Sequence, residues 1–277
     1  MKKITIPDSL MSMDNSIVKI FDYRTIENAN KQLINLSKNT FSFLTEGKKE
    51  VITGNGSVSI DNTKFLLMQS GHCLMTEKVS SSNKSYRSIL LFFSNDAILQ
   101  LIRKFDIHPA HKLNKQSVYS FQYDEFIRNY VKSIIDISKL PSKSRSNLMA
   151  VKFEEIMLFL IEKEGSDFIF SMLSECNQQS QKLIFVVESN KYNKLSLTEL
   201  AFLSNMSLSS FKREFVKQYA QSPIKWFQEQ RLEYASLLLR QEQKRASDIY
   251  SEVGYENLSS FIQAFKSKFG VTPKQYQ

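Results

Sequence analysis

The chain has 277 residues, which at roughly 100–200 residues per domain favours two domains over one. Lysine and arginine number 37 against 28 aspartates and glutamates, so the net charge is +9 and a polyanionic partner such as nucleic acid is favoured. No apolar run exceeds five residues, whereas a membrane-spanning helix needs about 20. The N-terminus also lacks the apolar segment of a secretion signal, so we expect neither a membrane-spanning nor a secreted protein.

Cysteine is rare in this sequence. Cys73 and Cys176 are too few for a disulfide framework or a cysteine metal cluster. We therefore expect a reducing, cytoplasmic location.

Residues 41–93 show the pattern of short strands joined by tight turns. Four of the seven glycines fall between residues 47 and 71, and turn-forming residues separate short apolar stretches. Strands so closely spaced predict an antiparallel sandwich or barrel. The expected strands are Phe41–Leu44, Glu50–Thr53, Ser57–Ile60, Phe65–Met68, Cys73–Thr76 and Tyr86–Phe93.

From Asn95 onward the apolar period changes from two to about 3.6, which predicts helices. A helix over 145–163 follows the break at 141–146 and should pair with the helix before it. Its apolar residues, Ile156 and Phe159 among them, either pack on their own domain or form a subunit interface. The apolar stripes lie within 98–105, 126–135 and 145–163.

A polar stretch over 165–180 predicts a linker between a domain at 1–164 and a second at 181–277. Residues 178–277 carry 14 basic and 9 acidic side chains, a net +5 (14 − 9), against +4 (23 − 19) for the 177 residues before them. The expected fold class is therefore α+β: an antiparallel β-barrel followed by helices, and then an all-α domain.

An internal repeat organises the second domain. Two segments, 197–219 and 247–269, each suit a short helix, a turn and a longer helix, the helix-turn-helix pattern. Ser207 and Ser247 are expected as helix N-caps and Gly254 as a turn residue. At an offset of 50 residues the matches are Leu208–Phe211 with Leu258–Phe261, Phe215 with Phe265, and Pro223 with Pro273.

Between the two units, residues 223–241 suit one continuous helix. At 1.5 Å per residue it makes a rigid spacer of roughly 27 Å. Two recognition helices held about this far apart could enter successive major-groove segments, which lie about 34 Å apart on one face of a duplex.

The longer helix of each unit carries a polar face suited to DNA. Arginine and lysine can read guanine, glutamine fits adenine, and hydroxyls bond to bases or phosphates. A single polar helix face is more often only solvated surface, but two matching copies favour DNA. The candidate DNA-binding residues are Ser207, Ser209, Ser210, Lys212, Arg213 and Lys217 in the first unit, and Asn257, Ser259, Ser260, Gln263, Lys266 and Lys268 in the second.

These residues resemble the DNA-binding domain of AraC/XylS-type bacterial transcription regulators. The order and spacing of the motifs over about 80 residues is similar to that family, with Tyr250 and Gln277 as departures. The matching motifs are Leu197–Ala201, Met206–Phe211, Ser222-Pro223, Arg231-Leu232, Ala235, Leu238-Leu239, Val253–Tyr255, Ser259, Phe261, Phe265-Lys266, Phe269–Pro273 and Tyr276.

The resemblance implies a sequence-specific regulator, commonly an activator that works with RNA polymerase on double-stranded DNA. It implies that Ser209, Lys212 and Arg213 read bases, with Ser259 and Gln263 as their counterparts. It also implies a cupin-like N-terminal β-barrel that binds a small-molecule or protein effector, followed by helices that form a homodimer.

Two other functions stay open at this point. A cupin-type enzyme or sensor fused to a DNA-binding tail would need metal ligands, but His72 stands alone and the His108/His111 pair follows the barrel. A Gly-X-Ser-X-Gly hydrolase motif is absent from the sequence. The tail could instead bind an acidic protein. We expect no enzyme, no metal and no cofactor.

Overall fold

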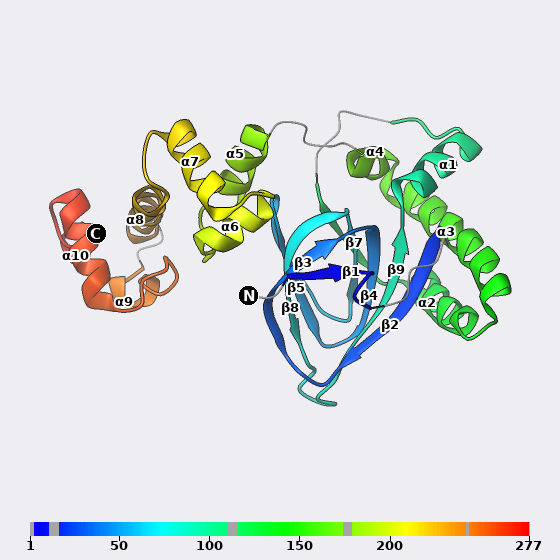
Figure 1. Ribbon diagram of the computed structural model, residues 1–277. Helices are drawn as coiled ribbons and strands as arrows, with labels where there is room; N and C mark the ends of the chain where they lie inside the picture. Colours follow the sequence, from blue (N-terminus) through cyan, green and yellow to red (C-terminus); the bar gives the residue numbers. More distant parts are fainter. Residues whose placement is uncertain (1–2, 11–16, 110–115, 174–178, 242–243, 277) are drawn as a thin grey trace. The chain divides into compact units, whose positions relative to one another are not determined.

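A computed structural model describes residues 3–10, 17–109, 116–173, 179–241 and 244–276 (Figure 1). The chain divides into two compact units, Met1–Asn177 and Gln178–Gln277. Each unit is described on its own.

Two five-stranded sheets form the β part of the first unit. In the first sheet, β1 pairs with β3 in parallel, and the other neighbours are antiparallel. The order of the first sheet is β1 (Lys3–Ile6), β3 (Ala29–Leu36), β8 (Gly71–Lys78), β5 (Lys48–Thr53) and β6 (Gly56–Ile60). The order of the second is β10 (Val118–Gln122), β7 (Lys64–Met68), β4 (Asn39–Glu46), β9 (Tyr86–Phe93) and β2 (Val18–Thr25).

The expected α+β fold class, with β-structure first and helices after it, is confirmed. The six expected strands lie within β4 to β9, whereas β1, β2, β3 and β10 are additional. Those four carry polar residues on the faces that turn to solvent, and β3 contains a register shift between Ala29 and Gln32. Such strands lack the continuous apolar run that marked the central ones.

Strand β4 is buried on both faces, and it explains how the first unit is layered. Because successive side chains point to opposite faces, Phe41 and Phe43 join the core under the helices. Leu44 joins the core between the two sheets, and Ser42 is fully buried on that same face. The second sheet is thus a middle layer.

Four helices complete the first unit: α1 (Asn95–Phe105), α2 (Glu125–Ser138), α3 (Ser142–Glu164) and α4 (Asp167–Leu173). Helix α4 lies inside the stretch expected as a linker. Its Phe168, Ile169 and Met172 are buried in the same core as the sheet phenylalanines. Three apolar side chains in seven residues stabilise a helix there, although the flanking sequence is polar.

Helix α3 carries two apolar stripes where the sequence suggested one. Met149, Phe153, Ile156 and Leu160 are buried in the protomer's own core, so of the two alternatives for Ile156 the structure shows packing on its own domain. Val151 is 59% exposed. It shares a second face with Leu148 and Phe159, because residues three, eight and eleven positions apart lie on one side of a helix with 3.6 residues per turn.

In the second unit, every regular element within residues 179–241 and 244–276 is a helix. The long helix α8 coincides with the expected connecting helix, and α6, α7 and α10 match the expected helices to within a residue or two. The helices are α5 (Gln179–Asn190), α6 (Leu197–Leu203), α7 (Leu208–Tyr219), α8 (Pro223–Gln241), α9 (Ala246–Ile249), α10 (Leu258–Phe269) and α11 (Pro273–Tyr276).

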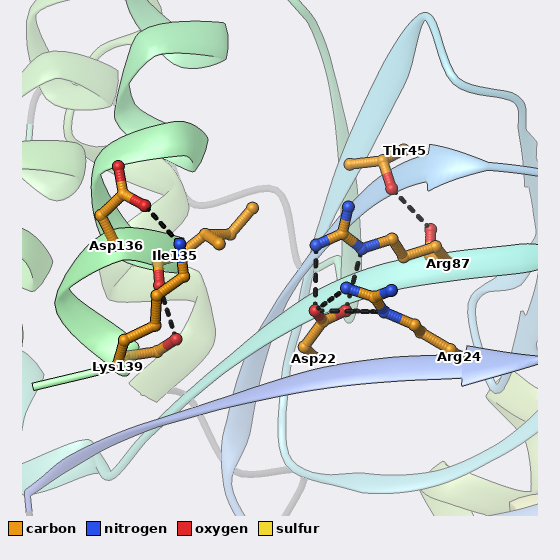
Figure 2. A network of polar contacts seen from close by, with 8 residues as sticks. Asp22, Arg24, Thr45, Arg87, Ile135, Asp136 and Lys139 are labelled. Carbon is orange, nitrogen blue, oxygen red and sulfur yellow. Dashed lines mark hydrogen bonds and ion pairs between the residues drawn. The ribbon is translucent and has the colours of Figure 1, made fainter.

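A charged network lies on the strands of the second sheet (Figure 2). Asp22 on β2 accepts hydrogen bonds from Arg87 on β9 at 2.9–3.0 Å and from Arg24 at 2.7 Å. Partial burial alone would raise the pKa of Asp22, but hydrogen bonds from Arg87 and Arg24 outweigh it and lower the pKa to about 2. The network ties the edge strand β2 to its neighbour.

Helix length and hydropathy bear on membrane insertion. Within the described ranges, every helix is too short or too polar to span a bilayer.

Candidate nucleic-acid interface

The first helix-turn-helix unit is built by local capping. Ser196 and Glu199 form a capping box at the start of α6. The turn after α6 places Asn205 at φ 57°, a left-handed conformation that asparagine tolerates better than most residues. Ser207 then caps α7, as expected, by accepting a hydrogen bond from the amide of Ser210 at 3.1 Å. The sequence thus sets where the recognition helix begins.

The second unit follows the same plan with different residues. Ser247 is not a cap: it lies inside α9, whose N-cap is Arg245, and its hydroxyl donates to Asp248. Gly254 sits in the turn at φ +89°. Asn257 caps α10 by accepting from the amide of Ser260 at 2.8 Å. Because asparagine is as good an N-cap as serine, the two recognition helices start alike.

Helix α7 separates its apolar and polar residues cleanly. Phe211 and Phe215 are fully buried. On the opposite side Ser209, Arg213 and Lys217 are exposed, with exposed Lys212 beside them. Ser210 is half-buried, and its hydroxyl accepts a hydrogen bond from the Ser207 hydroxyl at 2.9 Å. Three cations and one hydroxyl are therefore exposed along this helix and can face a ligand.

Helix α10 repeats the arrangement with fewer charges. Phe261 and Phe265 are fully buried, and the outward side presents Ser259, Gln263 and Lys266 as exposed side chains. The N-cap Asn257 and Ser260, whose amide donates to it, are also exposed.

Lys268 does not belong to this outward face. It is 21% exposed, and its ammonium donates to the Glu229 carbonyl at 2.9 Å and to Glu233 at 3.0 Å, both on α8. The sequence put Lys268 among the polar candidates because of its lysine side chain alone. Its long stem instead reaches back across the helix pair.

Helix α8 contacts both helix-turn-helix units. At its start Trp226 and Phe227 pack on α7, with ring centroids 5.7 and 5.9 Å from that of Phe215. Its second half shares a core with the other unit, formed by Leu232, Ala235, Leu238, Leu239, Ile249, Val253, Phe261 and Phe265. A continuous 19-residue helix thus joins the two recognition helices without a flexible linker.

A separate candidate site lies between the sheets of the first unit. A cavity of about 120 Å³ has mostly aliphatic walls, with Lys49 and Glu77 among its lining residues. These two residues are register partners on β5 and β8, and their charged groups lie 3.4 Å apart. The Lys49 ammonium also donates to Ser42 at 3.0 Å, and Ser42 shares a hydroxyl hydrogen bond with Ser88. A buried ion pair therefore forms one polar spot in an apolar pocket.

Two tyrosines adjoin this ion pair. Burial, together with the nearby Glu77 carboxylate, raises the pKa of Tyr23 to about 12 and that of Tyr86 well above its usual value. Both hydroxyls stay protonated at neutral pH, and Tyr23 lines the cavity.

The histidines do not assemble a metal site in the described part of the chain. His72 lies on β8 beside Asn35 of β3, and His108 is an exposed neighbour of Asp106. His111 and Cys176 fall outside the described residues. Among the residues that the structure does describe, no three histidine, cysteine, aspartate or glutamate side chains are grouped to hold a metal ion.

A β-domain followed by two helix-turn-helix units on one connecting helix defines a class of transcription regulators. Two family models match this chain, the ExsA N-terminal regulatory domain over residues 39–172 and a helix-turn-helix domain over residues 200–277. Both matches agree with a similarity of this chain to AraC/XylS-type transcription regulators.

Individual relatives span the chain to different extents. The virulence regulon transcriptional activator VirF of Yersinia enterocolitica is 30% identical over 156 residues, which cover 51% of this chain and 58% of VirF. The transcriptional activator PerA of Escherichia coli O127:H6 is 23% identical over 89% of this chain and 91% of PerA. A solved structure of ToxT from Vibrio cholerae matches with a TM-score of 0.46 and 14% identity, over 96% of this chain and 98% of ToxT.

Proposed function

We propose that this protein is a sequence-specific DNA-binding regulator that activates transcription in the cytoplasm. The observation that carries the proposal is the pair of capped recognition helices, α7 and α10, each with buried phenylalanines on one side and exposed polar residues on the other. A helix presented in this way fits the major groove, and its N-terminal half meets the base edges.

The two helices would contribute differently to DNA recognition. In α7, Lys212 and Arg213 suit the paired acceptors of guanine. In α10, Gln263 suits adenine, while Lys266 suits a phosphate. The remaining candidates fix position rather than sequence, since hydroxyl and amide groups at helix starts bind phosphates readily. They are Ser207, Ser210, Asn257 and Ser260, with the Lys217 ammonium as a further phosphate contact, whereas the hydroxyls of Ser209 and Ser259 can bond to bases.

Selection of bound duplexes from a random pool tests this function. We expect one enriched motif with two segments about one helical turn apart. On the selected duplex, log affinity should fall with log salt at a slope of about −5, if roughly six phosphates are neutralised. No enriched motif, or a flat salt response, would overturn the proposal and favour a protein partner.

The names of VirF and PerA as transcriptional activators support activation. We propose that this protein activates through a contact with RNA polymerase. In transcription with purified RNA polymerase, a template bearing the selected motif should give more transcript when the protein is added. A drop in transcript would identify a repressor.

We also propose that the cavity between the sheets holds a small effector. The matching N-terminal model is a regulatory domain, and the pocket pairs aliphatic walls with the Lys49–Glu77 ion pair. Because the two charges cancel, a neutral head group that accepts from Lys49 and donates to Glu77 fits better than an ion. The volume suits about six non-hydrogen atoms, since a cavity of about 150 Å³ holds one benzene.

Three matched probes test the effector class: butyramide, butyrate and butylammonium. Butyramide at tens of millimolar should raise the melting temperature of the first unit, because a ligand bound only to the folded state stabilises it. The two ions should have a smaller effect. A larger shift with either ion, or none with butyramide, would contradict a neutral ligand.

We propose further that the protein forms a homodimer through the exposed stripe of α3. Leu148 and Val151 are exposed there, and the Phe126 and Phe159 rings stack at 4.0 Å at the end of the same face. A two-fold interface brings the same patch from each copy together, so a long apolar stripe on one helix is self-complementary.

The dimer prediction is that Val151→Asp gives monomers. The carboxylate would be desolvated without a partner in the interface, which costs several kcal/mol. Analytical ultracentrifugation should show the protein shift from dimer to monomer. Ala150→Asp, an exposed position on another side of α3, is the matched control and should leave the dimer intact. A dimeric Val151→Asp variant would place the interface elsewhere.

A further inference from the structure

The two helix-turn-helix units are fastened to α8 by different chemistry. The first helix-turn-helix unit packs aromatic rings on the start of α8, with Tyr219 and Phe215 against Trp226 at centroid distances of 4.8 and 5.7 Å. The second helix-turn-helix unit contacts α8 through cations as well as through its apolar core. Lys268 bonds to Glu229 and Glu233, and the Arg240 guanidinium lies 4.3 Å above the Tyr276 ring.

A third cation, Arg231 of α8, packs against the turn of the second helix-turn-helix unit. A Cβ placed on Gly254 would come within 3.2 Å of the Arg231 guanidinium carbon and one of its nitrogens, and 3.3 Å of another. The guanidinium therefore lies flat and close over the glycine backbone. Arg231 is half-buried, and its charge also acts on the neighbouring Tyr255. A Cβ at this position would displace the guanidinium by a few tenths of an ångström, and the φ of +89° independently disfavours residues other than glycine.

From this geometry we infer that Arg231 is a positioning residue that sets the orientation of the recognition helix α10 on α8. Gly254 and Tyr255 lead directly into the Asn257 cap, so holding the turn fixes where α10 begins. The first helix-turn-helix unit packs on α8 through aromatic rings, so we expect its position not to depend on Arg231. This inference rests on the proposed DNA-binding function only for its effect on affinity, not for its effect on α10.

The planar shape of the guanidinium matters as much as its charge. Arginine stacks on flat groups through its delocalised plane, whereas the lysine ammonium is a compact, strongly hydrated point charge. An Arg231→Lys variant keeps the charge and loses the flat contact. It therefore separates positioning from simple attraction of DNA phosphates.

The first test measures the free protein. In Arg231→Met and Arg231→Lys, amide hydrogen exchange in α9 and α10 should become about tenfold faster, because the turn opens more easily. Exchange in α7 should not change. The single tryptophan, Trp226, lies in the aromatic cluster between α7 and α8, so unchanged emission confirms that the packing of α7 on α8 is intact. Lys225→Met, an exposed position on α8, is the control. Unchanged exchange in α10, or rescue by Arg231→Lys, would overturn the inference.

The second test uses DNA. Both Arg231 variants should bind the selected duplex about tenfold more weakly, since binding must then order a loosened unit. Footprints should keep the half of the motif read by α7 and lose protection on the other half. Uniform weakening across the footprint would contradict a selective role in α10. If wild-type protein selects no duplex while α10 exchange still rises in the variants, the proposed function fails and the positioning role stands.

Discussion

Replacing Glu77 by leucine should lower the free energy of unfolding of the first unit by about 3–5 kcal/mol, because Lys49 is left charged and buried without its carboxylate partner. The Lys49 side chain is only 2% exposed, so water cannot take the place of Glu77. The ammonium would keep one hydrogen bond, to Ser42. Urea unfolding followed by far-ultraviolet circular dichroism measures this loss. Trp226 emission follows unfolding of the helical unit Gln178–Gln277 separately, since the chain's only tryptophan lies there.

The double variant Lys49→Met/Glu77→Leu is the decisive control for this prediction. It removes both charges, and replacing a buried ion pair by apolar residues is often neutral or stabilising by about 1–4 kcal/mol. Lys139→Ala breaks an ion pair to Asp136 that is exposed on both sides (Figure 2), and should cost at most about 1 kcal/mol. If Glu77→Leu also costs less than about 1 kcal/mol, Lys49 is solvated and the ion pair does not organise the pocket.

The sequence predicted the central strands and the helix-turn-helix helices because strong apolar patterns define them. Strand β9 ends in a continuous apolar run from Ile89 to Phe93, β4 carries apolar residues from Phe41 to Leu44 interrupted only by Ser42, and the α7 phenylalanines repeat in α10. The strand β1 is short and its residues are mostly half-buried, so it gave no such signal. Its parallel pairing with β3 joins residues about 30 apart, a contact that periodicity cannot reveal.

The candidate interface was predicted unevenly for the same reason. Exposed polar residues on α7 follow from the spacing of Phe211 and Phe215, because the opposite side of a helix is then fixed. Contacts between helices do not follow from spacing. The ion pair between Lys268 and Glu233 and the contact between Arg231 and Gly254 depend on how α8 crosses the second helix-turn-helix unit. The Lys49–Glu77 pair was missed because a lysine and a glutamate on short strands look like solvent-facing residues until both sheets are placed.

Replacing Arg213 by alanine should weaken binding to the selected duplex by about 5- to 150-fold, equivalent to about 1–3 kcal/mol, and relax the preference at one base pair. Arg213 is exposed on the side of α7 opposite the buried phenylalanines. Its guanidinium can donate two hydrogen bonds to one guanine, and alanine leaves both acceptors of that base unpaired. Competition binding against duplexes that vary this base pair measures both effects.

Lys217→Ala is the matched control for Arg213, because it removes a cation from the same helix near its end. Lys217 is 72% exposed and only loosely paired with Glu214, at 3.9 Å. A phosphate contact carries no sequence information, so this variant should lose affinity equally on all duplexes and reduce the salt slope by about one. Equal losses on selected and random duplexes for Arg213→Ala would show that it too grips only the backbone. Base reading by α7 would then fall to Lys212 and Ser209, the other exposed polar residues toward the start of the helix.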